Sequence, residues 1–101
     1  MSLADLMHED RRLCILQCLA EAEGRALNED LLVKLVGHFR LGVVAPDMLR
    51  GYLSWLEAHD LVRIEKLTPS SGELWIATLT ATGLSVTQGR KWPGVALPSP
   101  R

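Results

Sequence analysis

The hydrophobic pattern of this chain changes its period once, close to residue 60, and this change limits the fold more than any other feature. Before it, apolar residues recur every three to four positions in three segments, which are residues 3–22, 29–39 and 46–60. This period is typical of amphipathic helices. After it, residues 61–67 alternate between apolar and polar side chains, and residues 74–79 form a second β-prone run. The sequence therefore predicts three helices followed by a β-hairpin.

Residues that favour helix ends stand at the borders of the helical segments. They are Ser2 with Asp5, or alternatively His8, at the first helix, then Gly24 after it, Asn28 before the second helix and Pro46 at the start of the third. Thr80 or Thr82 would cap a short fourth helix that ends near Gln88.

The composition fits one globular domain, since the 101 residues are 48% hydrophobic and 23% charged. The inward faces are expected to include Leu6, Leu13 and Leu16, then Leu31, Leu32, Leu35, Val36 and Phe39, and finally Leu49, Leu53 and Leu56. We assign residues 1–88 to the domain. Residues 89–101 contain three of the five prolines, and we expect an extended basic C-terminal arm there and not a packed element.

Two stretches resemble those of winged-helix regulators. In residues 48–62 an apolar pair closes a helix, a short polar step follows, and Leu61 and Val62 open a strand. Residues 79–83 read Leu-Thr-Ala-Thr-Gly, which is similar to the sequence that ends the wing in those families. Together with the order of elements, these stretches resemble a winged helix-turn-helix, an α+β and mostly helical fold with a β-hairpin wing and a short C-terminal helix.

More narrowly, the chain resembles the small ArsR-like winged-helix proteins of Mu-like prophages. The stretches that carry this resemblance are residues 19–22 before Gly24, 55–57, 61–63, 89–90, 93–95 and 98–100. The cysteine motif of metal-sensing ArsR proteins is missing from the third helix. Metal sensing is therefore not implied.

The resemblance implies binding to duplex DNA, with the second and third helices as the helix-turn-helix and the third in the major groove. The residues that would face base edges are Asp47, Met48, Arg50 and Ser54, and those that would contact the backbone are Arg63, Lys66, Arg90 and Lys91. The alternative for the third helix is a plain solvated face. Residues 68–73 contain no Lys or Arg, so a simple tight turn is the alternative for the wing tip.

The C-terminal residues allow two interpretations. Arg90, Lys91 and Arg101 surround Trp92 in sequence, and cations beside an aromatic ring bind phosphates and stack on bases. The same segment would alternatively cross a second subunit, anchored by Trp92, Val95 and Leu97. The resemblance implies a homodimer formed through the first helix and this arm.

Charge is distributed unevenly along the chain, and this distribution bears on two possible classes of function. Residues 1–60 carry six basic and ten acidic side chains, whereas residues 61–101 carry five basic and two acidic ones. We predict a phage or prophage transcriptional regulator that binds DNA as a homodimer. The acidic first part favours an alternative, in which the domain is a protein-interaction module that binds a phage or host protein and not DNA.

Other classes of function lack their sequence patterns. No Ser-His-Asp, paired-carboxylate or phosphate-loop pattern occurs, so we expect neither an enzyme nor a cofactor. Cys14 and Cys18 are expected to be reduced, buried thiols, because a metal site needs at least one more ligand nearby. Reduced thiols, the lack of an apolar run of about 18 residues and the acidic N-terminal stretch predict a cytoplasmic protein that does not enter a membrane.

Overall fold

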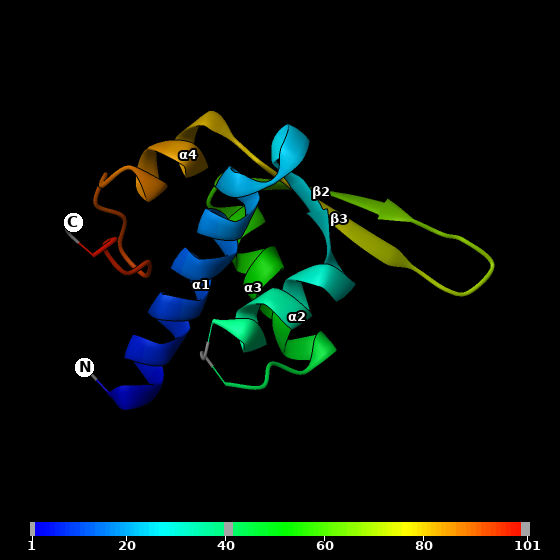
Figure 1. The fold of residues 1–101 in the computed structure, drawn as a ribbon, viewed down its shortest axis with the longest axis horizontal. Coiled ribbons are helices and arrows are strands. Elements are labelled where there is room, and N and C mark those ends of the chain that lie inside the picture. Colours follow the sequence, from blue (N-terminus) through cyan, green and yellow to red (C-terminus); the bar gives the residue numbers. More distant parts are fainter. Residues whose placement is uncertain (1, 40–41, 100–101) are drawn as a thin grey trace.

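The structure is a computed structural model that describes residues 2–39 and 42–99 (Figure 1). Its elements are α1 (Leu3–Glu21), the 3-10 turn η1 (Glu23–Arg25), β1 (Ala26–Asn28), α2 (Glu29–His38), α3 (Pro46–Ala58), β2 (Val62–Leu67), β3 (Leu74–Leu79) and α4 (Ala81–Thr87). The predicted order of three helices, a hairpin and a short helix is confirmed.

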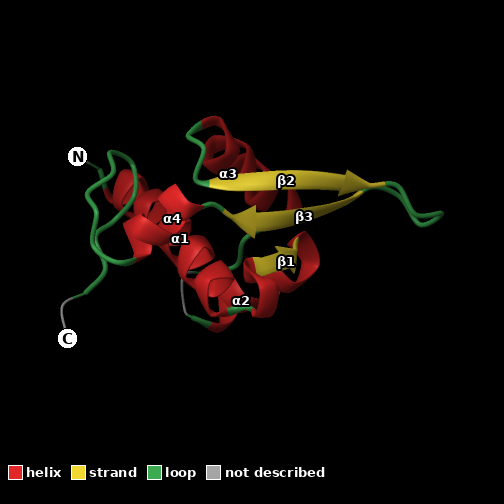
Figure 2. Cartoon of the chain, turned by 90° about the horizontal axis from the view of Figure 1, so that it is seen from above, coloured by secondary structure: helices red, strands yellow, loops and turns green. Residues whose placement is uncertain are grey.

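The sheet has one strand that the sequence pattern did not predict. β1 pairs antiparallel with β3, and the strand order is β1-β3-β2. The β1 pairing ends where Asn28 lies opposite Ile76, whereas the β2–β3 ladder continues to Leu67 opposite Leu74. Figure 2 shows the β2–β3 hairpin projecting beyond the helices as a wing.

Local capping interactions explain the helix starts. Ser2 and Asp5 form a reciprocal capping box at α1, and the Asn28 side chain accepts a hydrogen bond of 2.9 Å from the Leu31 backbone N–H. The Thr80 hydroxyl accepts from the Gly83 N–H at 3.0 Å. The caps predicted at residues 2, 28 and 80 are thus confirmed.

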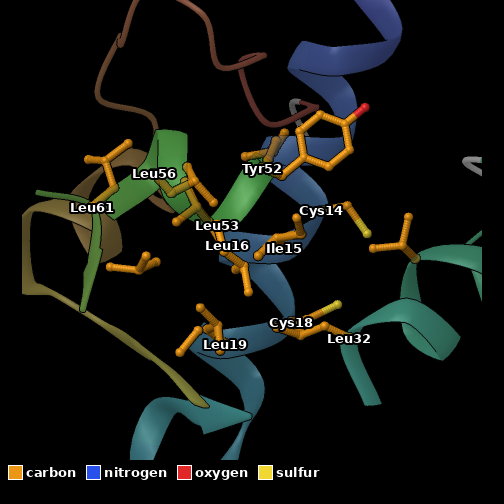
Figure 3. Packing of buried hydrophobic residues seen from close by; sticks show 14 of the residues in the cluster. Cys14, Ile15, Leu16, Cys18, Leu19, Leu32, Tyr52, Leu53, Leu56 and Leu61 are labelled. Carbon is orange, nitrogen blue, oxygen red and sulfur yellow. The ribbon is translucent and has the colours of Figure 1, made fainter. Parts of the chain in front are cut away.

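α1 runs through the middle of the fold and is buried on more than one side. Its buried residues include the consecutive run 13–16, because α2, β3 and α4 all pack against it (Figure 3). The prediction that Leu6 faces inward was wrong, since Leu6 is 44% exposed, whereas Leu13 and Leu16 are buried as predicted. Leu31 and Phe39 of the second helical segment are also exposed, because α2 ends at His38 and buries only one narrow side.

The C-terminal segment is packed, contrary to the expectation for residues 89–101. Val95 is buried, and Trp92 and Ala96 pack against the core. The Arg12 side chain donates a hydrogen bond of 2.8 Å to the Gly94 carbonyl, and the Ala96 N–H donates to the Glu9 carbonyl at 3.2 Å. The segment folds back over α1 because its apolar residues find uncovered apolar surface there. Arg101 lies outside the described residues.

Among residues 2–39 and 42–99, none of the helices combines the length and the hydropathy that crossing a membrane requires.

Candidate nucleic-acid interface

The first turns of α3 present a polar stripe to solvent. Leu49, Leu53 and Leu56 are completely buried and fix the helix against the core. Asp47 and Ser54 point away from these positions and are exposed. Three of the residues predicted to face base edges, Asp47, Met48 and Ser54, are thus accessible on one helix surface.

Arg50, the fourth predicted base-edge residue, is engaged within the protein. Its Nε and Nη2 donate to the two carboxylate oxygens of Glu29 at 2.7 and 2.8 Å, and Nη2 also donates to the Glu73 carbonyl at 3.0 Å. These bonds use three of the five N–H groups of the guanidinium and leave only those on Nη1. In this arrangement Arg50 does not present the paired donors that grip both acceptors of a guanine.

Glu29 is the buried partner in this ion pair. It is the first residue of α2 and is 5% exposed, and it also accepts a hydrogen bond of 2.7 Å from the Trp75 backbone N–H. The hydrogen bonds from Arg50 hold the pKa of Glu29 below its ordinary value despite burial. The helix N-terminus favours the same negative charge.

Trp75 brings the wing into the same cluster. The Arg50 guanidinium carbon lies 4.8 Å from the centre of the Trp75 ring, and the Lys66 ammonium nitrogen lies 4.5 Å from it. The Glu73 carboxylate accepts a hydrogen bond from the indole N–H. We call Glu29, Arg50 and Trp75 together the wing clamp, since they join α2, α3 and β3.

A hollow of about 500 Å³ opens beside the wing clamp. It is lined by Glu29, Asp30, Pro46, Asp47, Arg50, Pro69, Ser71, Gly72, Glu73 and Leu74. Four of these residues are acidic and one is basic. The surface between α3 and the wing tip is therefore acidic, and Arg50 is the predicted cation that lines it.

Arg63 is exposed on β2 and lies opposite Thr78, on the other face of the hairpin from Lys66. Arg90 and Lys91 are exposed in the segment after α4, which lies at the opposite end of the molecule from the wing tip (Figure 1). The Arg90 guanidinium is 5.5 Å from the Trp92 ring centre. The structure thus brings Arg50 and Lys66 together around Trp75 and leaves Arg63, Arg90 and Lys91 separate.

Glu29 and Trp75 were not predicted as members of this site. In the sequence, Glu29 indicates only the start of a helix, and Trp75 indicates only a strand. No spacing links positions 29, 50 and 75, because three different elements bring them together. The link becomes visible only once β1 aligns β3 against the start of α2.

Cys14 and Cys18 are free and buried, as predicted (Figure 3). A hydrogen bond with Cys18, together with burial, raises the pKa of the Cys14 thiol. Both thiols border a groove of about 1130 Å³ between α1, α2 and the C-terminal segment, which Leu35, Phe39 and Pro98 also line. Within the described ranges, no three Cys, His or acidic residues come together as metal ligands would.

Solved structures similar to this chain are winged-helix regulators. AbsC of Streptomyces coelicolor, a MarR family transcriptional regulator, has a TM-score of 0.58 and 25% identity, with 76% of this chain and 47% of that chain covered. Sco3205, a MarR family regulator of the same organism solved in complex with DNA, has a TM-score of 0.57 and 28% identity, with 90% and 60% covered. BpsR of Bordetella bronchiseptica, at 16% identity and a TM-score of 0.60, shows the fold alone, with 85% and 59% covered. The chain spans about half to three fifths of the length of these regulators.

Proteins of similar sequence identify the family of this chain more closely than the solved structures do. No model of a known protein family matches it. An uncharacterized protein of Haemophilus influenzae is 39% identical over 70 residues, which cover 66% of this chain and 64% of that protein. The uncharacterized protein gp26 of Escherichia phage Mu is 36% identical over 98 residues, which cover 96% of each protein. The chain has a winged-helix fold and belongs to the same protein family as phage Mu gp26.

Proposed function

We propose that this protein binds duplex DNA through α3 and the β2–β3 wing. The observation that carries the proposal is the likeness, over 90% of the chain, to a MarR family regulator solved in complex with DNA. The exposed stripe on α3 and the projecting wing support it, because a recognition helix and a wing need free surfaces to reach the grooves and the backbone.

In this proposal, Asp47, Met48 and Ser54 face base edges, with Asp47 accepting from a cytosine amino group. Arg63 and Lys66 contact phosphates from the wing. Arg90 and Lys91 lie too far along the molecule to share that contact. They would bind the backbone only of a duplex that continues along the protein.

We further propose a transcriptional regulator of phage or prophage origin, of the ArsR-like kind and acting in the cytoplasm. Support comes from the relationship to phage Mu gp26 and from the regulators of similar fold. We propose a homodimer through α1 and the C-terminal segment. The exposed apolar side chains Leu3, Leu6 and Leu97 support this arrangement, because they favour burial against a second copy.

Fluorescence anisotropy tests DNA binding directly. The protein is titrated into a random duplex pool and into the DNA upstream of its own gene, each at several salt concentrations. We expect affinity to fall steeply with salt and to favour the upstream DNA. The Lys66→Ala variant should lower the magnitude of the slope of log affinity against log salt by about one, because it removes one phosphate contact. Absence of binding at low salt would contradict the proposal.

The acidic hollow favours a second candidate function. Asp30, Asp47 and Glu73 line the surface where a DNA reader usually carries cations, and Glu29 neutralises Arg50. A protein partner from the phage or its host would tolerate this charge better than a duplex does. If anisotropy shows no binding to DNA, the hypothesis that the domain is a protein-interaction module is favoured.

A further inference from the structure

We propose that the wing clamp holds the wing at a fixed angle to α3, so that Glu29, Arg50 and Trp75 act as positioning residues for DNA binding. The inference rests on the proposed function for its DNA consequence. The claim that these residues immobilise the outer half of the hairpin depends only on contacts within the chain.

The clamp holds the hairpin at the point where its other support ends. β1 pairs with β3 only from Ile76 to Thr78. Trp75 is the next residue toward the tip, and its backbone N–H is bound by Glu29. Beyond it, residues 67–73 are all exposed. The outer hairpin is therefore joined to the body through the clamp at its base.

The geometry of the clamp favours one orientation of the wing. The pair between Arg50 and Glu29 is bidentate, at 2.7 and 2.8 Å, and such paired bonds fix the plane of the guanidinium. The same guanidinium donates to the Glu73 carbonyl in the wing and lies against the Trp75 ring. Rotation of the wing would break the contacts with Glu73 and Trp75 together and take from the buried Glu29 carboxylate the hydrogen bond of the Trp75 N–H.

The role of Arg50 follows from the direction of its bonds. Because the donors on Nε and Nη2 face inward, the charge of Arg50 is neutralised by Glu29 and is not offered to a phosphate. A positioning residue lowers affinity when it is lost but leaves the number of phosphate contacts unchanged. A phosphate-binding residue instead lowers the salt slope by about one.

Glu29→Gln and Asp30→Asn form a matched pair of variants for the DNA test, since both residues line the hollow and Asp30 is exposed. Both remove one negative charge from the same surface, but only the first disturbs the clamp. Electrostatics alone would make both variants bind duplex more tightly. We expect Glu29→Gln to bind about tenfold more weakly, with an unchanged salt slope, and Asp30→Asn to bind equally or more tightly. Tighter binding by Glu29→Gln, or a lower salt slope for Arg50→Gln, would overturn the positioning role.

Hydrogen exchange of the free protein tests the clamp without DNA. In Glu29→Gln we expect the amides of Glu65, Leu67 and Trp75 to exchange about tenfold faster than in the wild type, while the α1 amides stay unchanged. In Asp30→Asn all of these rates should match the wild type. If the wild type binds no DNA but the wing amides respond as expected, the proposed function fails and the clamp stands. If the wing amides of Glu29→Gln exchange at the wild-type rate, the clamp is refuted whatever the DNA result.

Discussion

Neighbouring side chains of α3 have different roles, since some pack the helix into the core and others form its exposed surface. Leu53 is completely buried, whereas its neighbour Ser54 is exposed. Leu53→Ala should lower the free energy of unfolding by about 2–5 kcal/mol, because it leaves a cavity in the core. Ser54→Ala should change it by less than about 0.5 kcal/mol. Urea denaturation followed by tryptophan fluorescence measures both, and a small effect of Leu53→Ala would contradict the register of α3.

The ion pair of Glu29 gives the protein a pH dependence on the acid side. The pKa of Glu29 lies below its ordinary value of 4.5 in the folded state. The ionised group therefore stabilises the fold above the ordinary value, and this contribution is lost as pH falls through the lowered pKa. Glu29→Gln should be less stable than the wild type at neutral pH, and the difference should shrink below about pH 4. Denaturant unfolding across this range checks the sign, and a difference that grows on acidification would contradict it.

At the scale of elements, two glycines within helices should respond in opposite ways to alanine. A Cβ at Gly51 in α3 would meet nothing within 4 Å, whereas a Cβ at Gly83 in α4 would lie 2.2 Å from the Leu61 carbonyl oxygen. Gly51→Ala should therefore stabilise the protein by about 0.5–1 kcal/mol through helix propensity. Gly83→Ala should destabilise it by about 1–3 kcal/mol, because α4 must move away from the loop before β2. Thermal unfolding of the two variants compares these effects, and equal shifts would contradict the close approach at Gly83.

Elements with strong local signals could be predicted from the sequence. The caps at Asn28 and Thr80 and the proline that opens α3 act within one turn of the chain, so their neighbours in sequence suffice. β1 has only three residues, too few to show an alternation, and it exists because β3 offers a free edge. The exposed face of α3 was likewise predictable from its period. The hydrogen bonds of Arg50 to Glu29 and Glu73 could not be predicted, because these partners are distant in sequence.

At the scale of the whole molecule, the C-terminal segment is part of the fold. Removal of residues 90–101 would take away Val95, which is buried, and uncover Trp55, against which Gly94 packs closely. We expect the truncated chain to lose at least about 2 kcal/mol of stability. Lys91→Ala, which changes an exposed residue of the same segment, serves as the control and should leave stability nearly unchanged. An unaltered melting temperature for the truncated chain would mean that the segment adds nothing to the core.

The mutual dependence within the wing clamp also has a consequence for sequence divergence. Because the carboxylate of Glu29 satisfies both the Arg50 side chain and the Trp75 backbone, a change at either charged position leaves a buried polar group without its partner. Single substitutions at positions 29 and 50 are therefore costly intermediates. Among relatives that keep this fold, these two positions should change together, and position 75, where the ring covers the guanidinium, should follow them.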